Sequence, residues 1–254
     1  DRAVTSEDYK TLVKSLYANA QSVQVYGGED AAVPDYGKVY ISIKAKSGSN
    51  LTVATKESLV SSLKSYAVAS VTPVIIDPET TFITLNVNFR YNSGATAKDI
   101  STLQTNVLST IVNYNNNTLN DFAGMFRYSQ ILEDINNADT SILSNITTVK
   151  MYKRISPTLS TGLKYTLSFN NALYNPHSGH NMSGGGIISS TGFKINNDES
   201  LNEHFLDDDG AGNLRVYYLS GTARVYTDAT YGTVDYDTGE VVLTSANITS
   251  ISNI

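Results

Sequence analysis

Apolar and polar residues alternate over several short segments in the first two thirds of the chain. The alternation is clearest over residues 80–91, where Ile83, Leu85, Val87 and Phe89 take every second position. A period of two is typical of a strand with one buried face. On this pattern we predict strands over residues 39–45, 71–76, 80–91 and 147–155.

Between these segments the apolar residues recur every third or fourth position, which is the helical period. Leu59 and Leu63 mark the first such segment, and Ile100, Leu103 and Val107 mark the second, which ends in the polar run 115–117. The pattern predicts helices over residues 55–69, 96–114 and 128–138.

The predicted order from residue 37 is strand, helix, strand, strand, helix, helix, strand. This order is that of a split β-α-β motif with one additional helix. We therefore predict an α+β fold with a ferredoxin-like domain over residues 37–157, whose helices cover one face of an antiparallel sheet. Residues 1–36 precede it with a helix over residues 5–17 and a short strand near residues 22–26.

Beyond Pro157 the helical period disappears. Short alternating segments are joined by glycine-containing turns such as Ser220-Gly221 and Thr238-Gly239, and residues 176–191 are mostly Gly, Ser, His and Asn. We predict a small all-β domain over residues 158–254 with a Gly/Ser/His loop and strands over residues 165–169, 214–219, 223–227, 232–236 and 240–244.

Composition and charge narrow the classes of function. The net charge of −6 gives no basic excess for a nucleic-acid backbone or an anionic membrane. The chain has no cysteine, which excludes disulfides, thiolate metal sites and cysteine nucleophiles. No apolar run approaches the length of a membrane helix. We expect no nucleic acid, membrane or cofactor among its partners.

Candidate chemistry is sparse. His177 and His180 have an H-x-x-H spacing, but a zinc site needs further ligands, so a loop is the preferred interpretation. Asp207, Asp208 and Asp209 lack the spacing of a calcium loop and predict a solvated acidic turn. No hydrolase or nucleotide-binding motif occurs, although paired carboxylates that converge only in space stay open as a glycosidase site.

A family resemblance begins with the opening residues. Arg2-Ala3-Val4-Thr5 followed by Asp8-Tyr9 resembles the R-A-V-T-x-x-D-Y signature of the baseplate J-like family of contractile phage tails. The likeness continues in the strand at residues 37–43 and in residues 59–66, 74–78 and 82–91. Residues 26–30 and the segment 232–239 most resemble the baseplate wedge proteins of T-even-type phages.

The resemblance implies a structural subunit of a tail baseplate wedge, located in the virion and assembled in the host cytoplasm. Such subunits associate into a ring around the hub and rearrange when the sheath contracts, with other wedge proteins as partners. The start at Asp1 without a methionine suggests a C-terminal fragment, which we expect to form a homodimer.

Tyrosines and apolar residues on uncovered faces are the candidates for self-association. On this basis we predict contacts through the first helix and the β domain, at Tyr9, Leu12, Leu16, Tyr217, Tyr218, Tyr226 and Tyr231. Two alternatives stay open: a tail-associated glycan hydrolase using convergent carboxylates, and a receptor-binding tip in which His177 and His180 hold a metal.

Overall fold

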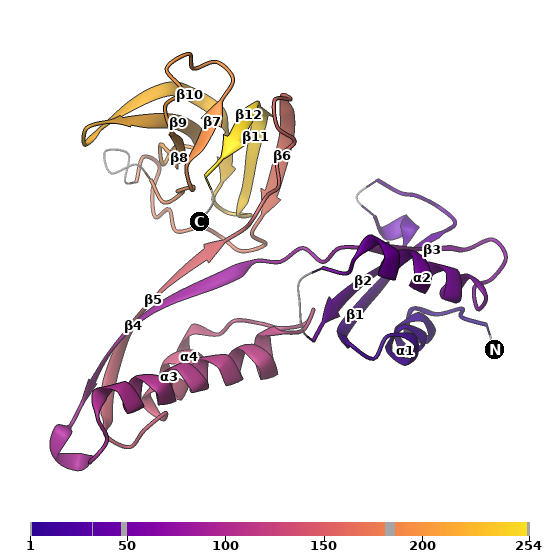
Figure 1. Ribbon diagram of the computed structural model, residues 1–254, viewed down its shortest axis with the longest axis horizontal. Helices are drawn as coiled ribbons and strands as arrows, with labels where there is room; N and C mark the ends of the chain where they lie inside the picture. Colours follow the sequence, from indigo (N-terminus) through magenta and orange to yellow (C-terminus); the bar gives the residue numbers. More distant parts are fainter. Residues whose placement is uncertain (1, 32, 47–49, 181–185, 253–254) are drawn as a thin grey trace. The chain divides into compact units, whose positions relative to one another are not determined.

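The computed structural model describes residues 2–31, 33–46, 50–180 and 186–252 (Figure 1). The chain divides into two compact units, each described below by itself: Asp1–Thr80 with Leu85–Val149, and Thr81–Thr84 with Lys150–Ile254. The fold is mixed α/β with more strands than helices among the described residues. The division into 1–36, 37–157 and 158–254 stays a prediction.

The first unit opens with two helices on a mixed sheet. Helix α1 begins in a capping box, in which the Thr5 hydroxyl accepts from the Asp8 amide and the Asp8 carboxylate accepts from the Thr5 amide. Strand β2 lies in the centre of the sheet, antiparallel to β1 and parallel to β3. The elements of this part are α1 (Ser6–Leu16), β1 (Ala20–Gly27), η1 (Gly28–Asp30), β2 (Lys38–Ala45), α2 (Val53–Lys64) and β3 (Thr72–Ile76).

Both helices cover the same core. Tyr9 and Val13 of α1 and Leu63 of α2 are buried against Ile41 and Ile43 of β2. Helix α2 ends at Lys64, five residues before the predicted end. The chain leaves the helix because residues 66–67 pair with the N-terminal segment through the isolated bridge between Ala3 and Ala67.

The rest of the first unit consists of two helices and most of a long β ribbon, of which residues 82–84 and 150–152 belong to the second unit. Strands β4 and β5 pair with each other, and Figure 1 shows α3 and α4 along one side of the ribbon. Leu85, Val87 and Phe89 of β4 pack with Ile131 and Ile135 of α4, as the alternation predicted. The elements are β4 (Phe82–Tyr91), η2 (Ser93–Ala95), α3 (Ile100–Tyr114), the π-helical turn η3 (Asn115–Leu119), α4 (Tyr128–Asn136) and β5 (Ile142–Tyr152).

The structure does not confirm the ferredoxin-like arrangement over residues 37–157. The predicted strands exist, but they fall into two sheets, because β2 and β3 pair with β1 while β4 pairs with β5. The predicted single antiparallel sheet also conflicts with the parallel pairing of β2 and β3. The coarser prediction of an α/β region of alternating helices and strands is confirmed.

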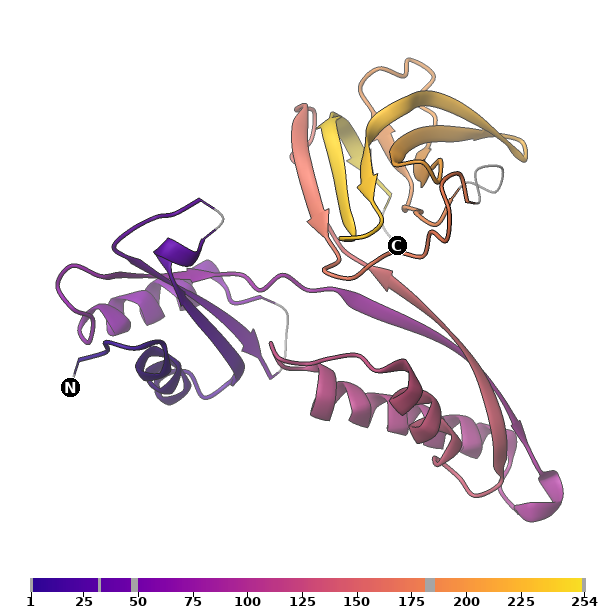
Figure 2. The same ribbon diagram turned by 180° about the vertical axis from the view of Figure 1, so that it is seen from behind.

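The second unit is built on one large sheet, seen from two sides in Figures 1 and 2. Among the described residues it has the strand order β12-β7-β8-β9-β10-β11-β6 and curves as a half-barrel around a core that includes Leu214, Val216 and Leu243. Its strands are β6 (Leu163–Ser168), β7 (Phe193–Ile195), β8 (His204–Asp208), β9 (Asn213–Ser220), β10 (Ala223–Asp235), β11 (Glu240–Ala246) and β12 (Ile248–Ile251).

The sequence pattern predicted this unit only in part. β6, β9 and β11 confirm three predicted strands. The segments 223–227 and 232–236, predicted as two strands, form the single strand β10, whose register shifts twice between Tyr226 and Gly232. Strands β7, β8 and β12 were not predicted. Part of the predicted Gly/Ser/His loop, residues 181–185, lies outside the described residues.

Gly232 is required where β10 lies between β9 and β11. A Cβ atom there would lie 1.9 Å from the Val242 carbonyl oxygen, a backbone atom that cannot move without disturbing the sheet. We expect Gly232→Ala to lower the free energy of unfolding of the second unit by about 2 kcal/mol, measured by urea denaturation.

Gly221 provides the matched control. It has a φ of 64° in the β9–β10 turn and nothing within 4 Å of a built Cβ. Because asparagine tolerates this left-handed conformation, Gly221→Asn should change the free energy by no more than about 0.5 kcal/mol. Equal losses in the two variants would contradict the assignment of the effect to the Val242 contact.

Candidate interaction surface

The outer face of β8, β9 and β10 carries an ordered set of aromatic and charged side chains. Phe205 pairs with Tyr217, which pairs with Tyr226, and Asp207 pairs with Arg215. Because side chains alternate between the two faces of a strand, these residues share one face. We call this set the tyrosine–arginine face; it consists of Phe205, Asp207, Arg215, Tyr217, Arg224 and Tyr226.

The buried face of the same strands fixes the orientation of the tyrosine–arginine face. Leu214 and Val216 of β9 are fully buried, and Leu206 of β8 packs against them. The hydrophobic core therefore orients the sheet so that the tyrosine–arginine face points away from it.

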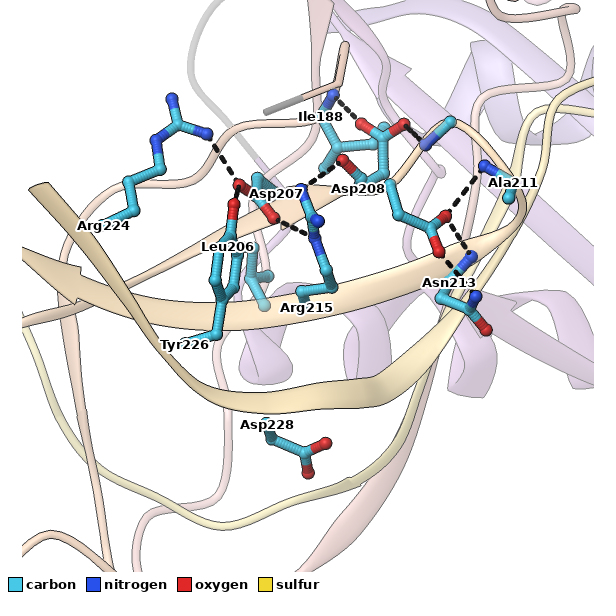
Figure 3. A network of polar contacts seen from close by, with 12 residues as sticks. Ile188, Leu206, Asp207, Asp208, Ala211, Asn213, Arg215, Arg224, Tyr226 and Asp228 are labelled. Atoms are coloured by element: carbon cyan, nitrogen blue, oxygen red, sulfur yellow. Dashed lines mark hydrogen bonds and ion pairs between the residues drawn. The ribbon is translucent and has the colours of Figure 1, made fainter. Parts of the chain in front are cut away.

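Asp207 is the centre of the face. Only 1% of the residue is exposed, and its carboxylate accepts from Arg215 Nε at 2.8 Å, Arg224 Nη1 at 2.6 Å and the Tyr226 hydroxyl at 2.9 Å (Figure 3). Burial, followed by the hydrogen bond to Asp207, raises the pKa of the Tyr226 hydroxyl above its usual value. The buried carboxylate holds two cations and a phenol in one geometry.

Each guanidinium also covers an aromatic ring. The Arg215 guanidinium lies 4.4 Å from the ring centroid of Tyr226, and that of Arg224 lies 4.7 Å from the centroid of Tyr217. The two tyrosine rings are 5.9 Å apart, and Phe205 lies 5.8 Å from Tyr217. The side chains therefore support one another in a rigid array.

The prediction of a solvated acidic turn is wrong for two of its three residues. Asp207 and Asp208 are both 1% exposed and belong to β8. Asp208 accepts from the amides of Ile187 and Ile188, each at 2.7 Å, and from the Tyr236 hydroxyl at 2.6 Å. Burial, followed by this bond, raises the pKa of Tyr236 well above its usual range.

Asp209 lies in the turn after β8 but is half-buried. Its carboxylate accepts from the amides of Ala211 and Asn213 in the β8–β9 turn (Figure 3). Arginines, amides and phenols engage Asp207 and Asp208, so neither carboxylate is free to act as the acid or base of a glycosidase.

The predicted contact residues of the first helix have different environments. Tyr9 is 2% exposed and lies in the core, where burial raises the pKa of its hydroxyl. Leu12 is half-buried against the same core, whereas Leu16 is 39% exposed. Leu16 is therefore the predicted residue of this helix with the most accessible side chain.

The four predicted tyrosines of the β domain do not form one cluster. Tyr217 and Tyr226 lie together on the tyrosine–arginine face. Tyr218 projects from the other side of β9, with its ring 5.8 Å from that of the buried His204, and Tyr231 packs against the core. The sequence analysis did not assign Phe205, Arg215 and Arg224 to this surface, and it placed Asp207 in an acidic turn. The period-two spacing within each strand indicates a shared face but not which strands pair.

The two histidines considered for a metal lie side by side. His180 Nδ1 is 3.3 Å from His177 Nε2, while His204 is fully buried elsewhere against Thr227 and Asn202. In the part of the chain that the structure describes, no group of three or more His, Asp or Glu residues could hold a metal ion. No helix there is long and apolar enough to span a membrane.

Comparison with known proteins places these features in a family. Residues 5–76 match the family model of baseplate structural protein gp6, C-terminal domain I, and residues 79–154 match that of C-terminal domain III. The chain is 30% identical to baseplate wedge protein gp6 of Enterobacteria phage T4 over 168 residues. This aligned segment covers 65% of the chain. The chain spans 25% of the length of that relative. Since the two family models together cover more than half of it, the chain belongs to the family of baseplate structural protein gp6.

Proposed function

We propose that this chain is a subunit of a phage tail baseplate wedge that associates with copies of itself and with other wedge proteins. In the complete assembly these copies form a ring around the hub and take part in the rearrangement that triggers sheath contraction. The observation that carries the proposal is the match of successive segments, residues 5–76 and 79–154, to domains of one baseplate protein. Membership of this family makes the chain a structural protein of the virion tail baseplate and not an enzyme.

The tyrosine–arginine face supports a role in protein contacts. Tyrosine and arginine are enriched among the residues that contribute most to binding at protein interfaces. Tyr226 is 40% exposed, and the Arg224 side chain is 36% exposed. Because Asp207 already fixes both side chains, a partner would order few further rotamers on binding.

One further apolar side chain extends the candidate surface. Leu219 follows Tyr217 by two residues on β9, so it lies on the same face, and it is 50% exposed. Leu16 of α1 is a separate candidate contact. The net charge of −6 supports protein partners in preference to nucleic acid.

The test is the solution mass of the chain over a concentration series, by light scattering or sedimentation. We expect a dimer. Replacing Tyr217 and Tyr218 together with serine should weaken association about tenfold or more, because the change removes the Tyr217 ring from the tyrosine–arginine face and the Tyr218 ring from the other side of β9. Circular dichroism should show that the double variant stays folded.

Tyr36 and Tyr174 provide the control, since both are exposed, at 80% and 70%. A variant with serine at these two positions also loses two tyrosines and should keep the original dimer. A strict monomer at every concentration would refute self-association within these residues. An unchanged dimer in the Tyr217/Tyr218 variant would exclude this region as the contact.

A further inference from the structure

His177 and His180 lie at the two ends of a β-turn in the second unit. The His180 amide donates to the His177 carbonyl at 3.0 Å, and Gly179, the third residue of the turn, has a φ of 78°. A positive φ at the third position is the pattern of a type II turn, and glycine adopts it without strain. Because the first and fourth Cα atoms of a β-turn lie within about 7 Å, the turn brings the two imidazoles together. We call residues 177–180 the histidine turn.

The histidine turn is held against the turn that follows β8. The Gly210 carbonyl accepts from the Gly179 amide at 2.8 Å and from the Asn175 side chain at 3.1 Å. A Cβ atom on Gly210 would lie 2.3 Å from the His180 carbonyl oxygen, so the two backbones are in close contact. The Tyr174 ring also packs edge-on against the His180 imidazole, with centroids 5.4 Å apart. Contacts with the rest of the unit therefore fix the backbone that carries the two histidines.

The hydrogen bonds of the turn assign the protons of both imidazoles. His177 Nδ1 is 3.2 Å from the Ser178 carbonyl oxygen. A carbonyl can only accept, so Nδ1 carries the proton of His177 and Nε2 carries a lone pair. His180 Nδ1 lies 3.3 Å from this Nε2 and donates to it. One proton therefore lies between two ring nitrogens, either of which binds a metal ion when it carries a lone pair.

The spacing of these two nitrogens matches that of two ligands on one ion. Zinc binds imidazole nitrogen at about 2.0–2.1 Å in a tetrahedral arrangement, which places two such nitrogens about 3.3 Å apart. Metal-binding histidines usually donate their other ring N–H to a carbonyl or carboxylate, which fixes the ring and its tautomer. His177 already makes this bond to the Ser178 carbonyl. His177 is exposed and His180 is half-buried, so an ion can reach the pair from solvent.

The charges beside the histidine turn favour a cation. Ser178 lines a hollow of about 430 Å³ together with Asp235 and Asp237. Among the described residues, the lining of this hollow contains no lysine or arginine. Carboxylates raise the local concentration of cations, whereas a lysine at the same place would repel them.

We propose that the histidine turn binds a divalent transition-metal ion of the zinc class through His177 Nε2 and His180 Nδ1. The ion takes the place of the proton between the rings, and His180 changes to the tautomer with its proton on Nε2, so both imidazoles stay neutral. In the described part of the chain no third histidine or carboxylate completes a group of three, so water fills the other positions on the ion. Imidazole suits zinc, nickel and copper, whereas magnesium and calcium prefer oxygen ligands.

Zinc chloride is the probe, titrated by calorimetry into the full chain after purification without a histidine tag and treatment with a chelator. We expect one zinc ion per chain. His177→Gln and His180→Gln should each weaken binding about a hundredfold, because the ion loses its second, intramolecular ligand. Ser178→Ala is the matched control. It leaves the turn and the backbone carbonyl that accepts from His177 in place, so it should keep the original affinity.

NMR of the ring nitrogens gives a readout that a loss of folding would not imitate. Zinc should move the ¹⁵N signals of His177 Nε2 and His180 Nδ1, because both then bind the ion directly. The signals of His204, which is fully buried elsewhere in the unit, should not move. Calcium at the same concentration should leave all three histidines unchanged.

Three results would overturn the proposal: no zinc bound at millimolar concentration, full affinity in either glutamine variant, or zinc-induced shifts at ring nitrogens other than these two. The proposal does not depend on self-association, and the Tyr217/Tyr218 variant keeps both histidines. Failure of the zinc site and failure of the dimer are therefore separate results.

Discussion

Replacing Asp207 with asparagine is expected to lower the free energy of unfolding of the second unit by about 3 kcal/mol. Asparagine keeps the size of the side chain but removes the charge and one acceptor oxygen. Arg215, with 13% of its side chain exposed, would then lie next to a second guanidinium without a counter-charge. The value lies at the low end for broken buried pairs, because Arg224 reaches solvent.

Differential scanning calorimetry of the full chain measures the effect. The transition of the second unit should move down by about 15 °C, since 1 kcal/mol shifts a unit of this size by about 4–8 °C. The transition of the first unit should not move, because Asp207 and its partners all belong to the second unit.

Asp237→Asn is the matched control. Asp237 is exposed and belongs to the same unit, so the substitution changes the net charge equally. We expect a change of about 0.5 kcal/mol or less. If the two variants lost similar stability, the loss would come from net charge and the buried cluster would not be the cause.

The Asp207 cluster also shows what the sequence could not indicate. Three successive aspartates before Gly210 have the local composition of a turn. Their burial depends on Arg215 and Arg224, which come from two other strands. No local pattern reports that a cation eight or more residues away will return to the same carboxylate. The prediction therefore failed at Asp207 and Asp208, and Asp209 lies in the turn but is half-buried.

The sequence pattern also predicted strands without predicting how they pair into sheets. Alternation in β2 and β4 correctly predicted strands and their buried faces, because a period of two follows from strand geometry. It carried no information about partners, so β3 and β4 were assigned to one sheet although each pairs elsewhere. Strand β7 covers only Phe193–Ile195, which is too short to show an alternation.

Helical periodicity likewise does not show which apolar residues of α1 are available to a partner protein. Tyr9 lies on an apolar stripe of α1, and such a stripe faces either the protein's own core or a partner. The stripe alone does not distinguish the two. The structure shows that Tyr9 and Val13 face the β1–β2–β3 sheet, while Leu16 at the end of the helix stays 39% exposed.

The difference between buried and exposed apolar residues of α3 predicts the second large loss of stability. Leu103 is fully buried, whereas Leu108 on the same helix is 61% exposed. We expect Leu103→Ala to lower the free energy of unfolding of the first unit by about 3 kcal/mol, because it removes buried apolar surface and leaves a cavity. Leu108→Ala should change it by about 0.5 kcal/mol or less, since alanine favours the helix and little buried area is lost.

Urea denaturation of the full chain, followed by an NMR signal from each unit, separates the two outcomes. Both variants make the same chemical change on one helix, so helix propensity cancels in the comparison and the difference reports burial. The signal from the second unit should keep its midpoint in both variants. Similar losses at Leu103 and Leu108 would mean that the exposed side of α3 is covered in solution, and a concentration-dependent loss at Leu108 would identify a second copy of the chain as the cover.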